Sequence, residues 1–82
     1  MKIYICDSKG EIIKLIIEST ITILDLKNKI KEIKYVKDDV ILCHNGKILE
    51  DTKTIEESGL NEENILSFLG NFVPVEKKIN FY

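Results

Sequence analysis

Cys6, Cys43 and His44 are the residues whose types could support nucleophilic or metal chemistry. A nucleophilic cysteine needs a base such as imidazole within hydrogen-bond reach. His44 follows Cys43 in a segment that reads as a strand, and neighbours in a strand point to opposite faces. Two cysteines alone cannot form a metal site, and their spacing is far from Cys-x-x-Cys. We find no carboxylate pair, phosphate loop or nucleophile constellation, so we expect no enzyme, metal or cofactor.

Composition limits the remaining function classes. The chain has 82 residues, a formal net charge of −2 and 32% charged residues of both signs. This size fits one domain with a single core. The charge gives no basic footprint for nucleic acid, and no apolar stretch approaches membrane-spanning length. No secretory signal pattern opens the sequence, so we expect a cytoplasmic or nuclear monomer with reduced thiols.

One segment, Thr22–Lys34, has apolar residues at helical spacing and is expected to be the single long helix. Thr22 can act as N-cap, and Asp25 three residues later completes a capping box with a shorter acid. The apolar stripe needs a sheet to cover it, and its members are Ile23, Leu26, Ile30 and Ile33.

Alternating or short apolar runs predict strands over residues 2–7, 12–18, 40–45, 47–49 and 65–69. Turns at Asp7–Gly10 and at Asn45-Gly46 connect two hairpins. Residues 50–64 read as a surface connection anchored by Ile55 and Leu60, with one helical turn over Thr54–Ser58. The prediction is an α+β fold with a mixed sheet of four to five strands packed on one helix. Residues 1–69 form the domain and residues 70–82 a tail or linker.

Strand phase also separates core from surface. The expected core consists of Ile3, Ile5, Ile13, Leu15, Ile17, Ile23, Leu26, Ile30, Leu42, Leu49, Ile55, Leu60, Leu66 and Phe68. The outward positions are mostly apolar or weakly polar, although a solvated sheet face should be polar. We interpret this face as a partner site. The alternatives are that the tail or another domain covers it, or that isoleucine is overused on the surface.

Several blocks of sequence resemble the ubiquitin family over residues 1–69. They are Met1-Lys-Ile-Tyr-Ile5, Leu26-Lys-Asn-Lys-Ile30, Asn45-Gly-Lys-Ile-Leu-Glu-Asp-Thr-Lys-Thr-Ile55, Gly59-Leu60 and Ile65-Leu-Ser-Phe-Leu69. The resemblance implies a β-grasp fold in which the first and last strands lie parallel at the centre of the sheet.

The resemblance also implies a function, and the sequence departs from the family at one informative place. Conjugated members end in a basic tail that closes on two adjacent glycines, whereas Gly70-Asn71-Phe72 follows Leu69 and the chain has no Gly-Gly pair. This favours a non-covalent interaction module of the ubiquitin–proteasome pathway. The implied partners are ubiquitin receptors, proteasome subunits or ubiquitin-interacting helices. A modifier conjugated after processing of a longer precursor, and a free splicing-type ubiquitin-like protein, are the alternatives.

Site residues follow from the same resemblance. The family's main recognition patch falls on Ser8, Ile41, Cys43, Gly46, Lys47, Ser67 and Leu69, and a second patch falls on Tyr4, Ile12 and Ile65. Ile41 stands where the family often has an arginine, so the patch should be more apolar and less basic. In the implied fold, Cys6 and Cys43 lie about 9–10 Å apart, two strand spacings, beyond disulfide reach.

Overall fold

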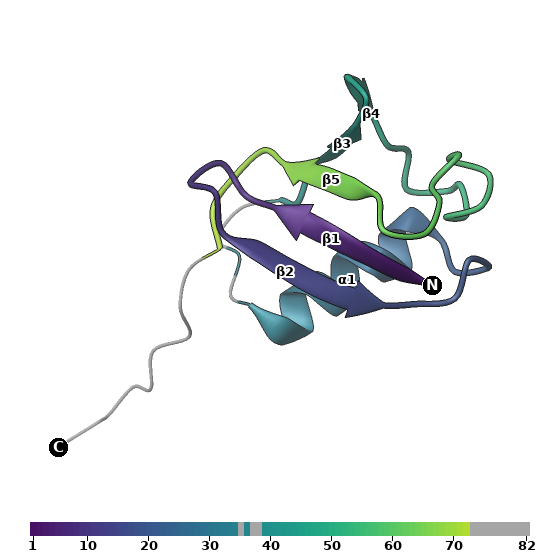
Figure 1. Ribbon diagram of the computed structural model, residues 1–82, viewed down its shortest axis with the longest axis horizontal. Helices are drawn as coiled ribbons and strands as arrows, with labels where there is room; N and C mark the ends of the chain where they lie inside the picture. The colour runs from purple at the N-terminus through teal and green to yellow at the C-terminus, as the bar shows by residue number, and fades with distance from the viewer. Residues whose placement is uncertain (35, 37–38, 73–82) are drawn as a thin grey trace, which may run out of the picture.

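The computed structural model describes residues 1–34, 36 and 39–72, which form one helix and one sheet (Figure 1). The elements run in the order β1 (Lys2–Cys6), β2 (Ile12–Ile16), α1 (Ile23–Ile33), β3 (Leu42–His44), β4 (Lys47–Ile48) and β5 (Ile65–Phe68). The helix crosses one face of the sheet, and the other face is left open (Figure 1). This confirms the predicted α+β class.

The sheet has five strands in the order β2-β1-β5-β3-β4. The two central strands, β1 and β5, are parallel, and the other neighbours are antiparallel. The N-terminal ammonium group extends the first hairpin, because it donates to the Ile17 carbonyl at 2.8 Å. The expected mixed sheet with parallel first and last strands is confirmed.

The second hairpin turns where its sequence predicts. Asn45 and Gly46 have φ angles of 53° and 79°, the positive values that a type I′ turn requires at both central positions. The two-residue loop therefore sets His44 opposite Lys47 and Cys43 opposite Ile48. In the first hairpin Gly10 also has a positive φ, 92°, as expected for the turn.

The helix begins with the predicted capping box. The Asp25 N–H donates to Thr22 Oγ1 at 3.1 Å, and the Thr22 N–H donates to Asp25 Oδ2 at 3.2 Å. The long connection satisfies two further N–H groups, since Ile23 donates to the Lys53 carbonyl and Leu24 to the Asp51 carbonyl. The free N–H groups of a helix end thus fix the neighbouring loop as well.

One member of the helix stripe was assigned wrongly. Ile33 is 48% exposed, whereas Ile23, Leu26 and Ile30 are fully buried. At about 100° per residue, Ile33 lies about 80° around the helix from Ile23, at the margin of the apolar arc. It is also the last helical residue, and the extended backbone of Lys34 ends the helix there.

All fourteen expected core residues are buried, none more than 9% exposed. Val40 and Phe72 join them. The connection over residues 50–64 is held as predicted by Ile55 and Leu60, at 0% and 4% exposure. A single turn follows Thr54, whose carbonyl accepts from the Ser58 N–H at 3.0 Å, without becoming a helix.

Residues 70–72, which the sequence placed in a tail, pack onto the domain. Phe72 is 5% exposed, and its ring centroid lies 5.2 Å from that of Phe68. Gly70 makes this path possible, because a Cβ there would lie 2.8 Å from Phe68 Cζ. The rest of the expected tail, residues 73–82, lies outside the described residues, as do residues 35, 37 and 38 of the connection after the helix.

We expect Phe72→Ala to lower the free energy of unfolding by about 3–5 kcal/mol, because it removes a buried ring and leaves a cavity. Urea denaturation followed by circular dichroism measures this loss. Phe72→Leu, which keeps most of the apolar volume, should cost clearly less. A loss below about 1 kcal/mol for Phe72→Ala would contradict burial of this ring in the core.

Candidate functional site

The outward face of the sheet carries a row of residues that crosses all five strands. Ile12 lies opposite Cys6, Cys6 beside Ser67, Ser67 opposite Cys43, and Cys43 opposite Ile48. We call these five residues the transverse row. Because paired residues of neighbouring strands share a face, the row is continuous from β2 to β4. At about 4.8 Å per strand spacing it is roughly 19 Å long.

Four residues of the predicted main patch lie in or beside the middle of this row. Cys43 and Ser67 are direct neighbours across β3 and β5. Leu69 follows Ser67 by two residues and is 57% exposed. Its N–H donates to the Ile41 carbonyl at 3.0 Å, which places Ile41 alongside. The structure therefore brings these residues together, and their role in binding stays a prediction.

The remaining main-patch residues lie at the margins. Gly46 and Lys47 belong to the exposed turn and strand at the β4 edge. The Ser8 N–H donates to the Gly70 carbonyl at 2.9 Å, and the Ser8 hydroxyl donates to Asn71 Oδ1. Ile41, 40% exposed, also borders a groove of about 360 Å³ that Leu24 helps to line. Ile41 therefore lies between Leu69 of the patch and this groove.

The second predicted patch adjoins the first. Tyr4 lies beside Ile65 across β1 and β5, in the row of pairs next to the transverse row. Ile12 belongs to the transverse row itself, with Cys6 between it and Ser67. The two patches are therefore parts of one surface rather than separate sites.

Ile48 also belongs to this surface, although neither patch predicted from the sequence includes it. Ile48 is 65% exposed and continues the apolar surface onto β4. Its place follows from the Asn45-Gly46 turn, whose two-residue loop pairs Ile48 with Cys43. Ile16, at 69% exposure, is also outward but lies four residues from Ile12 along β2, outside the transverse row.

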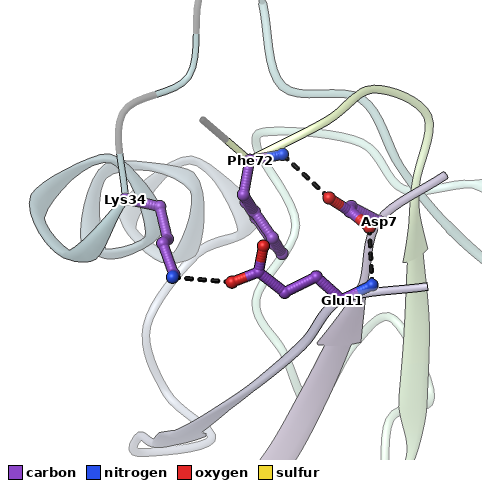
Figure 2. Close-up of polar contacts among 4 residues, drawn as sticks. All are labelled: Asp7, Glu11, Lys34 and Phe72. Carbon is purple, nitrogen blue, oxygen red and sulfur yellow. Dashed lines mark hydrogen bonds and ion pairs between the residues drawn. The ribbon is translucent and has the colours of Figure 1, made fainter. Parts of the chain in front are cut away.

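A buried carboxylate fixes the loop beside this surface (Figure 2). Asp7 is 5% exposed. Its Oδ1 accepts from the N–H groups of Lys9 at 3.0 Å and Glu11 at 2.8 Å, and its Oδ2 accepts from the Phe72 N–H at 2.9 Å. The Glu11 side chain continues the connection to the helix, with its Oε2 at 2.6 Å from Lys34 Nζ. The Asp7 side chain thus joins the first turn to residues 70–72.

Two opposing effects set the pKa of Asp7. Burial raises it, because the charged carboxylate loses hydration. The backbone hydrogen bonds from Phe72, Glu11 and Lys9 stabilise the charged form and outweigh burial, so the pKa lies below the ordinary value of 3.8. The hydrogen-bonded carboxylate therefore stays ionised at neutral pH.

The thiols occur where the sequence placed them. Cys6 and Cys43 are free and partly exposed, with β5 between their strands. Cys43 is outward and pairs with Ile48, whereas the adjacent residue, His44, pairs with Lys47. In residues 1–34, 36 and 39–72, no group of three or more His, Cys, Asp or Glu side chains is arranged to hold a metal ion.

One helix on a five-stranded mixed sheet with parallel central strands defines the ubiquitin-like β-grasp class. The model of the ubiquitin family matches residues 3–72, and the chain belongs to this family. A search of curated proteins found no match. Within the described part of the chain, no helix is long and apolar enough to cross a membrane.

We expect Asp7→Asn to destabilise the domain at pH 7 by about 1–3 kcal/mol, because its amide nitrogen cannot accept a hydrogen bond from an N–H donor. Urea denaturation measures this loss. Asp51→Asn is the control: the Asp51 side chain, which pairs with Lys27, is 49% exposed, so the change should cost at most about 1 kcal/mol.

The pH dependence of stability follows from the lowered pKa of Asp7. The unfolded chain binds the Asp7 proton more tightly than the folded protein does. The contribution of the ionised Asp7 carboxylate to stability is therefore complete above the ordinary carboxyl pKa. It is lost as pH falls through the lowered folded-state value. The stability gap between wild type and Asp7→Asn should therefore narrow from pH 7 to pH 2, and a constant gap would contradict this account.

Proposed function

We propose that this protein is a non-covalent protein-interaction module of the ubiquitin-like type. The exposed apolar face of the sheet is the observation that carries the proposal. Its isoleucine and leucine side chains on β2, β4 and β5 and just beyond β5 are between 55% and 69% exposed: Ile12, Ile16, Ile48, Ile65 and Leu69. A sheet face that stays in water is normally polar, and a contiguous apolar surface is typical of a binding site.

Docking of a partner would remove this apolar area from water. Burial of apolar area is favourable by about 25 cal/mol per Å². The geometry suits an amphipathic helix, whose diameter of about 10–12 Å spans two to three of the five strands. We therefore propose ubiquitin-interacting helices of receptors or proteasome subunits as partners, in the cytoplasm or nucleus. Family membership supports the ubiquitin–proteasome pathway as the setting.

The alternative is a covalent modifier, which has less support. Conjugated members of the family need an extended, accessible end that closes on Gly-Gly. Here the corresponding stretch is Gly70-Asn71-Phe72, and Phe72 is buried with its N–H bonded to Asp7. Residues 70–72 would have to leave the domain before they could extend, which would expose the Phe72 ring.

Titration of the nitrogen-15-labelled protein with a ubiquitin-interacting helix from a proteasomal receptor tests the proposal. We expect amide shifts to cluster on Cys43, Gly46, Ser67 and Leu69. Leu69→Asp should abolish them, because it places a charge in the middle of the apolar surface.

Leu24→Asp is the matched control. Leu24 is 48% exposed but lies on the first turn of α1, where an acidic residue suits the helix dipole. Binding should survive this change. If no amide shifts at millimolar peptide, or if both variants bind like the wild type, docking of this helix class on the sheet face is wrong.

A further inference from the structure

We propose, on the basis of the function proposed above, that the two patches form one site that receives a single bulky apolar side chain of the partner helix. The centre of the outward face consists of Cys6, Ser67 and Cys43, three consecutive members of the transverse row. We call them the floor. Their short side chains lie side by side on β1, β5 and β3, the three inner strands of the sheet.

Longer apolar side chains surround the floor on four sides. Ile12 and Ile48 end the transverse row on the two outermost strands. Tyr4 and Ile65 form the neighbouring pair on one side, and Leu69 follows Ser67 on the other. We call these five residues the rim. Ile12, Ile48, Ile65 and Leu69 are 55–65% exposed, whereas both floor cysteines are only partly exposed.

Size complementarity identifies what the surface should bind. Interfaces reach the packing density of protein interiors at their centre, so short side chains must be met by a long one. A small residue over the floor would leave a void between rim and partner. A Phe, Leu or Met side chain over Ser67 would fill the space above the floor, between the rim residues Ile65 and Leu69. These properties are typical of the central anchor of an interface.

Charge completes the description of the partner. The floor and rim hold no charged side chain, so the contacting face of the helix should be uncharged. Lys14, opposite Tyr4 on β2, shares this face, is exposed and has no ion-pair partner among the described residues. Lys2 differs, because its Nζ forms an ion pair with Glu63 Oε2 at 3.3 Å. The complement is a helix with an apolar central residue and an acidic residue on the side that faces β2.

Two peptides separate this inference from the proposed function. Both derive from one ubiquitin-interacting helix and differ only at the central apolar position, which is Ala in one and Phe in the other. We expect the Phe peptide to bind at least about tenfold more tightly, measured by calorimetry and amide shifts. If the Ala peptide binds equally well or better, the anchor inference is wrong and the docking function stands. If neither peptide binds the sheet face, both are wrong.

A reciprocal substitution tests the floor itself. Cys43→Ile lengthens a floor side chain on an outward strand position, where β-branched residues fit well. It should weaken binding of the Phe peptide by about tenfold and leave the Ala peptide unchanged or tighter. Asn28→Ile adds the same side chain at an exposed helix position and should change neither affinity. Equal affinities of wild type and Cys43→Ile for the Phe peptide would overturn the inference.

The rim provides a third comparison, between residues of β2 and β4. Ile12→Ser and Ile48→Ser should each weaken the same one-to-one binding event, because the two residues flank a helix that lies over the floor. Ile16→Ser removes an isoleucine that is at least as exposed, four residues from Ile12 along β2, and should have little effect. Binding of two helices per domain, or sensitivity to Ile48→Ser without sensitivity to Ile12→Ser, would show two separate patches instead.

Discussion

Burial of one helix stripe against one face of the sheet is the interaction on which the structure depends. Ile23, Leu26 and Ile30 are fully buried in one cluster with the inward residues of the strands and with Ile55 and Leu60 of the long connection. A chain of this size provides one such helix, so it covers one face of the sheet. The outward face must then be polar or must bind something else, and here it is apolar. The fold and the proposed binding surface are therefore two consequences of the same two-layer packing.

The Asp7 carboxylate adds a constraint that hydrophobic packing cannot supply. Three backbone N–H groups, two from the first turn and one from Phe72, converge on it. Burial of such a group is costly unless every oxygen accepts hydrogen bonds, and here both do. The carboxylate holds the first turn against residues 70–72 at the margin of the apolar surface. The position of Ser8 and Leu69 thus depends on a polar contact made outside the patch.

Local patterns predicted those features whose causes are local. Helical spacing located α1, the capping residues Thr22 and Asp25 set its start, and Asn45-Gly46 fixed the second hairpin. Burial of Phe72 had no local signal, because it depends on Phe68 and on Asp7, 65 positions away. Strand phase could place site residues on the outward face. It could not show that Ile12 continues the row of Cys43, since that requires the registers of three strand pairs.

An apolar sheet face bounded by open edges also carries a risk of self-association, and the edge strands oppose it. β4 has only two residues, which leaves little backbone for pairing with a second chain. β2 is longer, but Lys14 stands at its centre between Ile12 and Ile16. If two copies paired antiparallel about the middle of β2, each Lys14 would lie opposite its counterpart, and like charges there are destabilising. In the docking proposed above the same lysine would attract an acidic partner, so the edge disfavours a second copy and suits a different chain.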